Sequence, residues 1–246
     1  MSEENNSKVP SHVGIIMDGN RRFSKRLMMS PYKGHEWGAK KIREALEWCR
    51  ECGVRELTLY AFSIQNFNRP KAEFDYLMDL FRKNFDELKD DKRIYENRIR
   101  VNVIGRIGMF PDDVGQKMRE IMELTKEHDA YILNFAMAYG GQEEIVDAAK
   151  RIAEQVREGR LDIDDIDKKT FSMNLYLSSE PDLIIRTGGE KRTSNFLAYQ
   201  SVYSELFFVD KMWPEFEKKD WAAILEEYSK RERRFGAGSF NDIKQA

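Results

Sequence analysis

The sequence lacks the features that mark membrane, secreted and nucleic-acid-binding proteins. No apolar run approaches the roughly 18 residues that a membrane span needs. The start, MSEENNSKVPS, is acidic and polar where a signal peptide has a basic end and an apolar stretch. Lys and Arg number 41 against 43 Asp and Glu, which gives a formal net charge of -2 and no basic excess. We therefore expect a cytoplasmic protein that does not bind nucleic acid.

The chain is also poor in cysteine. Its 2 cysteines, Cys49 and Cys52, form a CxxC at the end of a segment with helical periodicity, just before Gly53. A redox CxxC normally opens a helix, where the helix dipole lowers the thiol pKa. A zinc site would need two further ligands, and the whole chain has 3 histidines. We predict a reduced structural pair, with redox and zinc roles as the alternatives.

No Pro/Gly/Ser-rich linker and no internal repeat divides the chain. Its hydrophobic fraction of 41% is too high for disorder, and 246 residues are enough for one full core. We predict a single domain over residues 1–246, in which 1–11 and 237–246 are flexible tails.

Short apolar runs rich in branched and aromatic residues alternate with longer segments of helical spacing. This alternation is typical of a parallel sheet covered by helices. We therefore predict an α/β domain with a central, mainly parallel six-stranded sheet flanked by helices. The predicted strands are 13–17, 56–62, 100–104, 131–138, 182–185 and 205–209. The predicted helices are 38–51, 71–88, 111–127, 142–158, 168–177 and 219–234.

Polar residues follow several of these strands. Ligands of open parallel sheets bind beyond the carboxyl ends of the strands, where DGNRR, SIQNFNR and RTGGEKRTS would meet. A carboxylate, glycine turns and arginines can together hold Mg²⁺ and phosphate. We expect two anion sites there, with Asp18 and Glu205 as candidate Mg²⁺ ligands and Arg69 as a further cation. Each motif alone equally fits an ordinary turn or a solvated surface, so the prediction depends on their joint occurrence.

The helix predicted after Arg69 carries an apolar stripe. Such a stripe is usually core, and we expect most of this one to be core. Alternatively, the helix and the sheet enclose a cavity for a hydrocarbon chain. The stripe is Leu77, Met78, Leu80, Phe81 and Phe85, and the candidate cavity walls on the sheet are Ala61, Phe135 and Met137.

The sequence gives little support to three other kinds of site. No GxxxxGK[ST] is present, which argues against a nucleotide-binding P-loop. DIDDIDKK lacks the glycine and the later ligands of a calcium loop. RERRFG is basic but has no interleaved aromatic residues, so it gives little support to nucleic-acid binding.

Several segments, taken in order, resemble the cis-prenyltransferase family, the undecaprenyl diphosphate synthases. The resemblance runs from about His12 to Gly236, and GNRRF is closer to archaeal and eukaryotic members than to the bacterial GNGRW. The segments are HVGIIMDGNRRFSKR, YKGHEWGAKK, TLYAFSIQNFNRP, NFAMAYGGQEEIVDA, DLIIRTGGEKRTSNFLAYQSVYSELFFVDKMWPEF and RERRFG.

The resemblance implies that an allylic prenyl diphosphate and isopentenyl diphosphate bind side by side, with Mg²⁺ assisting loss of the first diphosphate. It implies catalytic roles for Asp18, which holds Mg²⁺, and Asn66, which takes part in proton removal, and it makes Glu205 a second metal carboxylate. Because an amide is a poor base, we interpret Asn66 as orienting a water or the departing diphosphate. The implied substrate-binding residues are Gly19, Asn20, Arg21, Arg22, Phe23, His35, Ser63, Ile64, Gln65, Phe67, Arg69, Arg186, Arg192, Thr193 and Ser194.

The chain departs from the family pattern in places. Pro31 stands where bacterial members have an arginine, Gln65 replaces a glutamate, and Arg21 replaces a glycine. Arg234 and Gly236 match the family's C-terminal Arg-x-Gly. This chain therefore has both the C-terminal motif and the Asp18 loop, which the family's non-catalytic partner subunits lack. We therefore expect a homodimer in which each tail completes the partner's isopentenyl diphosphate site.

The sequence thus predicts a Mg²⁺-dependent cis-prenyltransferase that makes a long-chain polyprenyl diphosphate, a precursor of glycan lipid carriers. Release of such a product favours transient contact with a membrane surface. The alternatives are a family member with a different acceptor or coupling position, and a non-catalytic polyprenyl-binding subunit.

Overall fold

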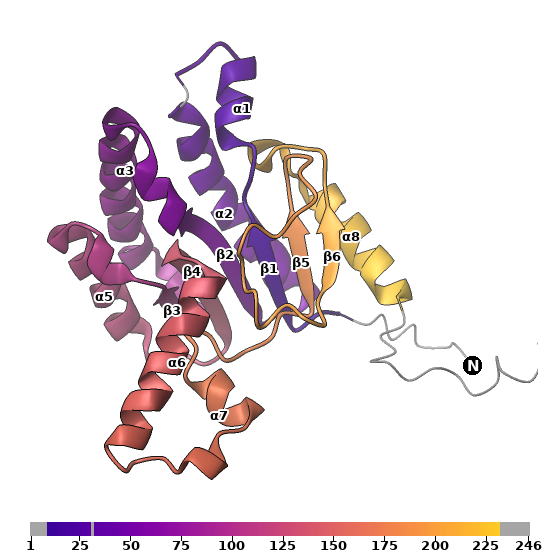
Figure 1. Cartoon of the computed structure of the whole chain (residues 1–246). Coiled ribbons are helices and arrows are strands. Elements are labelled where there is room, and N and C mark those ends of the chain that lie inside the picture. The colour runs from indigo at the N-terminus through magenta and orange to yellow at the C-terminus, as the bar shows by residue number, and fades with distance from the viewer. Residues whose placement is uncertain (1–8, 31, 232–246) are drawn as a thin grey trace, which may run out of the picture.

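A computed structural model describes residues 9–30 and 32–231, and its centre is a six-stranded sheet (Figure 1). Every pair of neighbouring strands is parallel, in the order β3-β4-β2-β1-β5-β6. Each predicted strand overlaps an observed one, which confirms the predicted fold class. The strands are β1 His12–Ile16, β2 Glu56–Ser63, β3 Ile99–Ile104, β4 Tyr131–Tyr139, β5 Leu183–Arg186 and β6 Glu205–Phe208.

All six predicted helices are present in the structure, together with two short ones, α1 and α4, that the sequence did not predict. Helices of five or seven residues are too short to show a hydrophobic period. The predicted end of the last helix at Arg234 lies outside the described residues. The helices are α1 Asn20–Arg26, α2 Lys33–Cys52, α3 Lys71–Lys89, α4 Lys92–Glu96, α5 Asp112–Thr125, α6 Gly141–Arg157, α7 Lys168–Met173 and α8 Lys218–Lys230.

Helix α2 begins five residues before its predicted start at residue 38. Gly34 in this first turn does not break the helix, because it is needed where α2 packs closely against α1. A Cβ on Gly34 would lie 1.9 Å from the Asn20 carbonyl oxygen, so only glycine lets α1 approach α2 this closely. The other end of α2 is as expected, with Gly53 in the left-handed conformation at φ 80°. Cys49 is buried near this end, and burial raises the pKa of its thiol far above the usual range.

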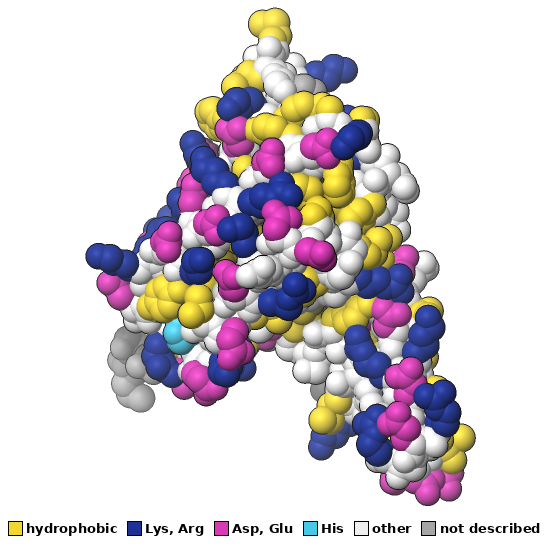
Figure 2. Space-filling model, turned by 90° about the vertical axis from the view of Figure 1, so that its left-hand side faces the viewer, with side chains coloured by type: hydrophobic (Ala, Val, Ile, Leu, Met, Phe, Trp, Pro, Cys, Tyr) yellow, Lys and Arg dark blue, Asp and Glu magenta, His cyan; other side chains and the backbone are white. Residues whose placement is uncertain are grey.

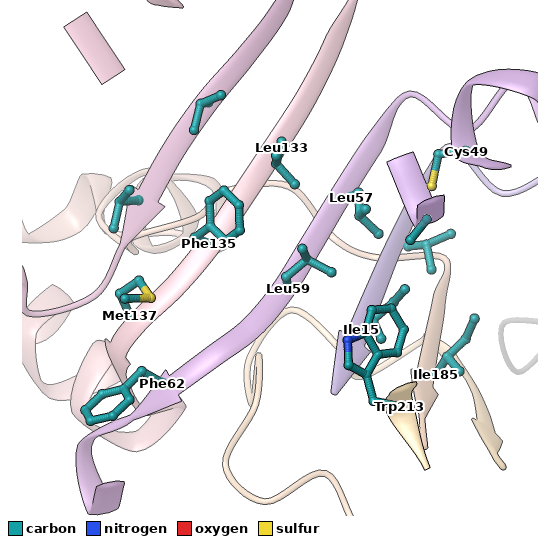
Figure 3. Close-up of a cluster of buried hydrophobic side chains, with 14 of the residues drawn as sticks. Ile15, Cys49, Leu57, Leu59, Phe62, Leu133, Phe135, Met137, Ile185 and Trp213 are labelled. Carbon is teal, nitrogen blue, oxygen red and sulfur yellow. The ribbon is translucent and has the colours of Figure 1, made fainter. Parts of the chain in front are cut away.

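Alternate side chains of the sheet enter two different layers. Leu59, Phe135 and Met137 project to the side that Figure 3 shows, where α2, α3, α5 and α8 contribute to one core cluster. Residues on the other side, among them Ile16 and Tyr139, pack against residues 177–197. Because both faces of the sheet are covered, its central strands are continuous apolar runs rather than alternating ones.

A cavity of about 960 Å³ is lined by α2 and α3 on one side and by the sheet on the other. Asp18, Asn66 and Arg186 line it where the strands end, and Val54 and Ile99 line it where they begin. The seven steps along β2 from Glu56 to Ser63 correspond to a length of about 23 Å. The cavity therefore runs the length of the sheet. Apolar side chains of the sheet form one wall, and charged residues line both ends, among them Asp18 and Arg186 at the carboxyl end and Arg55 and Arg93 at the amino end.

The apolar stripe of α3 lines this cavity for the most part. Leu77, Leu80, Phe81 and Phe85 belong to the lining, whereas Met78 does not. Ala61, Phe135 and Met137 line it from the sheet, as the alternative reading of the sequence expected. The expectation that most of the stripe is core is confirmed, because Leu77, Met78 and Phe85 belong to the core cluster and Leu80 and Phe81 pack against it. Four of the five therefore pack the core and wall the cavity as well, and both roles have the same helical spacing.

Candidate active site

Asp18 lies two residues beyond β1, where its own loop meets the end of β5. Its Oδ2 accepts a hydrogen bond from Arg186 Nη2 at 2.9 Å. Its Oδ1 accepts one from the Gly19 backbone N–H at 2.6 Å and lies 3.2 Å from Arg22 Nη2. The Asp18 side chain is 31% exposed and faces the cavity, so its carboxylate is held in place and still accessible to a ligand.

Two glycines allow these loops to come together. Gly19 has φ 103°, and a Cβ there would lie 2.7 Å from the Met212 Cβ. Gly188 has φ 86°, and a Cβ there would lie 3.1 Å from the Asp18 carbonyl oxygen. Any L side chain would strain the backbone and separate the loops. The DG and TGG segments are therefore built for close approach of backbone to backbone.

Arg186, the last residue of β5, is the buried cation of the site. One of its nitrogens, Nη1, donates to the Arg192 carbonyl at 2.5 Å and to Ser194 Oγ at 2.6 Å. Its Nε is buried and has no hydrogen-bond partner within the described residues. An unpaired buried donor costs stability, so this arginine is held at the site at the expense of the fold.

A second cationic cluster lies where β2 leads into α3. Arg69 Nη1 donates to Glu73 Oε1 at 2.8 Å and lies 3.4 Å from His35 Nε2. The same Glu73 oxygen is 3.7 Å from Arg21 Nε, and the Glu73 side chain is only 2% exposed. One buried carboxylate therefore holds three of the predicted substrate-binding residues together.

Burial is the main cause that lowers the pKa of His35 to about 4, and the neighbouring Arg69 lowers it further, while Glu73 raises it. His35 is therefore a neutral imidazole at pH 7. The sequence analysis missed Glu73, although its position four residues after Arg69 at the start of a helix is a recognisable ion-pair spacing.

Asn66 is fixed by its own turn. Its Oδ1 accepts a hydrogen bond from the Ser63 backbone N–H at 3.0 Å, and the Ser63 side chain accepts one from the Asn66 backbone, which makes a capping box at the 3-10 helix η1 (Ile64–Asn68). Both residues line the cavity. The predicted binding residue Phe67 packs instead into an aromatic cluster, with ring centroids 5.1 Å from Phe62 and 5.3 Å from Phe110.

The remaining predicted substrate-binding residues lie around these clusters. Asn20 lines the cavity and donates to the Met17 carbonyl, and Phe23 is buried and packs against Trp37. Ile64 is half-buried and Gln65 is exposed, and neither belongs to the lining. Arg192 lines the cavity, and Thr193 and Ser194 continue the loop whose Ser194 hydroxyl binds Arg186.

Within this chain Glu205 does not meet Asp18, which corrects the expectation that the two carboxylates share one metal ion. Glu205 opens β6 and pairs with Leu183, which is level with Val13 at the amino end of the sheet. Its Oε2 accepts a hydrogen bond from Arg231 at 2.8 Å. In parallel strands the first residue lies at the opposite edge from the last, so the sheet itself separates Glu205 from Asp18.

Other expectations fall on residues that the structure does not describe. Pro31 and the C-terminal Arg234 and Gly236 lie outside 9–30 and 32–231. Among the described residues, no group of three or more His, Cys, Asp or Glu could hold a metal ion. In that same part of the chain, no helix is both long and apolar enough to cross a membrane.

The geometry defines a class of protein. Arg69 and Arg186 lie with the Asp18 carboxylate at one end of a cavity whose wall along the sheet is apolar. This arrangement suits amphiphilic substrates that carry a diphosphate on a hydrocarbon tail, and chemistry at the carbon next to that diphosphate.

Comparison with known proteins gives the family. The model of the putative undecaprenyl diphosphate synthase family matches residues 16–236. The chain belongs to this family and is a prenyltransferase of the cis type. Curated relatives are similar over most of their length. Tritrans,polycis-undecaprenyl-diphosphate synthase (geranylgeranyl-diphosphate specific) from Pyrococcus horikoshii is 53% identical over 93% of this chain and 87% of that protein. The protein of the same name from Methanocaldococcus jannaschii is 48% identical over 93% and 83%.

Solved structures agree with this assignment. Lavandulyl diphosphate synthase from Lavandula x intermedia, in complex with dimethylallyl diphosphate, has a TM-score of 0.85 and 34% identity over 93% of this chain and 98% of that chain. A probable undecaprenyl diphosphate synthase from Campylobacter jejuni has a TM-score of 0.77 and 33% identity over 93% and 99%.

Proposed function

We propose that the chain condenses isopentenyl diphosphate repeatedly onto an allylic prenyl diphosphate and so makes a long-chain polyprenyl diphosphate. The observation that carries this proposal is the single cavity of about 960 Å³, which has Asp18, Arg69 and Arg186 at one end and apolar walls along the sheet. Such a cavity holds the diphosphates among cations while the hydrocarbon chain extends along the sheet. Relatives named as geranylgeranyl-diphosphate specific favour that compound as the primer.

The reaction separates charge, and the described residues are suited to stabilise it. The allylic C–O bond breaks and diphosphate leaves, the new C–C bond forms to isopentenyl diphosphate, and a proton is lost from the latter. Arg22 and Arg186 beside Asp18 supply positive charge for the departing diphosphate. Asn66, fixed by Ser63, is placed to orient the water or diphosphate oxygen that takes the proton.

The donor set fits Mg²⁺ held mostly by substrate. Mg²⁺ is commonly bound through one or two carboxylates together with substrate phosphates, and Asp18 supplies one such carboxylate in the cavity. When bound there, Mg²⁺ would neutralise the diphosphate that leaves. Glu205 lies at the other edge of its own chain, so it would reach such a site only from a second copy.

A homodimer is part of the proposal, and the edge strand β6 supports it. Leu206 and Phe208 on this strand are each 37% exposed, and Tyr203 just before it is 59% exposed. An edge strand with exposed apolar residues is a common surface for pairing with another copy.

We place the enzyme in the cytoplasm, peripheral to the membrane, with its product serving as a glycan lipid carrier precursor.

A second candidate is coupling to a different acceptor or at a different position. The observation that favours it is the fold similarity to lavandulyl diphosphate synthase, together with Arg21 and Gln65, which depart from the family pattern. A non-catalytic accessory role is less well supported, because Asp18, Asn66 and Arg186 all line one cavity.

Mass spectrometry of the products tests these functions directly. Purified protein would be incubated with Mg²⁺, isopentenyl diphosphate and allylic primers of increasing length. The proposal predicts a ladder of products spaced by five carbons. A single product without further spacing supports the second candidate, and the absence of any product overturns autonomous catalysis.

A further inference from the structure

The loop between α1 and α2 exposes apolar side chains that contribute nothing to the core. Leu27 is 44% exposed, Met28 96% and Met29 37%. Trp37 on α2 is 48% exposed and packs against Phe23 of α1 at a ring-centroid distance of 5.6 Å. We call Leu27, Met28, Met29 and Trp37 the α1–α2 tip. The loop forms the apex of the molecule in Figure 1, and Figure 2 shows hydrophobic side chains at this apex.

The backbone holds Met28 in an unfavourable conformation. Its φ is 53°, in the left-handed region where a helix end normally has glycine or asparagine. The Met28 N–H donates to the Lys25 carbonyl at 3.1 Å, and the Met29 N–H donates to the Ser24 carbonyl at 3.0 Å. This ordered turn therefore presents a methionine where the fold itself would favour a smaller polar residue.

Basic residues outnumber acidic ones around the tip, although Lys33 pairs with Glu36 and Arg26 pairs with Glu215. Between Gly19 and His35 the sequence has five basic residues, Arg21, Arg22, Lys25, Arg26 and Lys33, and no acidic one, although the whole chain has a net charge of -2. The side chains of Arg22 and Arg26 are 46% and 51% exposed even though each has an acidic partner. Exposed apolar residues beside clustered basic ones match the surface of an anionic bilayer, which takes up the first and attracts the second.

The tip also lies close to the mouth of the cavity. Helix α1 begins two residues after Asp18, and its seven residues span about 10 Å. We propose that the α1–α2 tip docks into the surface of an anionic lipid bilayer, so that the cationic mouth of the cavity is held at the membrane. A prenyl diphosphate is an amphiphile that partitions to that surface, so the benefit of docking to prenyl transfer rests on the proposed function. The docking itself does not depend on that function.

Vesicle sedimentation of the full chain tests the docking. The vesicles would be phosphatidylcholine alone or a mixture with phosphatidylglycerol. Met28→Asn removes the apolar side chain at a position whose backbone conformation suits asparagine. Met173→Asn is the matched control, because Met173 is 70% exposed at the end of α7, away from the tip. We expect the wild type to bind the anionic vesicles, Met28→Asn to bind roughly threefold less or weaker still, and Met173→Asn to bind like the wild type. The melting temperature of Met28→Asn should be unchanged or higher.

Several results would overturn the docking. These are a wild type that binds neither vesicle, a Met28→Asn variant that binds as well as the wild type, or an equal loss in both variants. Concentration-dependent self-association that Met28→Asn abolishes without lipid would assign the tip to a second copy instead. Turnover of a short soluble primer without vesicles should be the same in all three proteins. If none of them turns over, the proposed function fails while the vesicle result stands.

Discussion

The two ends of the sheet carry arginine–carboxylate pairs of nearly equal length but different environment. At the carboxyl end, Arg186 and Asp18 are 2.9 Å apart, with side chains 6% and 31% exposed. At the amino end, Arg98 and Asp129 are 2.8 Å apart, with side chains 54% and 72% exposed. Solvent screens the second pair, whereas the first lies at a cavity in which charges interact strongly. The distance alone therefore does not identify the functional pair.

The most severe way to break this comparison is to remove one carboxylate at each end. Asp18→Asn should lower kcat by roughly 10³-fold, because the loss of one preorganised charge at a reacting centre typically costs that much. Asp129→Asn should leave kcat and the melting temperature unchanged. Steady-state kinetics of the two variants give the answer, and equal losses in both would contradict the assignment of the site.

Glycines with positive φ give a second contrast, between the site and a turn that follows α6. Gly19→Ala should destabilise the protein by about 3 kcal/mol, since it adds a clash with Met212 to backbone strain. Gly159 has φ 67° with open space around it, so Gly159→Ala should cost about 1 kcal/mol from strain alone. Urea denaturation measures both. A similar cost for the two variants would mean that the close approach of the loops at Asp18 is not tight.

The Glu73 cluster can be tested through its counter-charge. Glu73→Gln leaves Arg69 without its buried partner and should destabilise the free protein by about 2 kcal/mol. Inorganic diphosphate should then raise the melting temperature of this variant more than that of the wild type, because the anion replaces the lost charge. Glu120→Gln, an exposed change on α5, is the control. An equal diphosphate shift in all three proteins would separate Glu73 from the binding site.

The pKa of His35 predicts a smaller effect that depends on pH. Because this pKa is about 4 in the folded protein against an ordinary 6.5, the unfolded chain takes up a proton first as the pH falls. Stability is therefore lost between about pH 6.5 and pH 4, and the loss at pH 5.5 is on the order of 1 kcal/mol. Denaturation of the wild type and His35→Gln at pH 7 and pH 5.5 should show a smaller loss in the variant. Identical losses would refute a neutral, buried His35.

The sequence predicted the sheet well because its central strands are buried on both faces, which makes each of them a distinct apolar run. It predicted the carboxyl-end loops for the same reason, since a parallel sheet brings them to one edge. Glu205 was predicted at the same edge as Asp18, although Glu205 begins its strand and Asp18 follows the end of one. In a parallel sheet these two positions lie at opposite edges. Glu73 was missed because a helical pattern does not show that one of its charges is buried.

The most direct test of the account is a single-turnover measurement on wild type and Asp18→Asn, with equilibrium binding of isopentenyl diphosphate to each. We predict that the variant binds this substrate within about tenfold of the wild type but forms the first five-carbon addition roughly 10³-fold more slowly. An unchanged rate in the variant would contradict the central claim that the carboxyl edge around Asp18 is the active site.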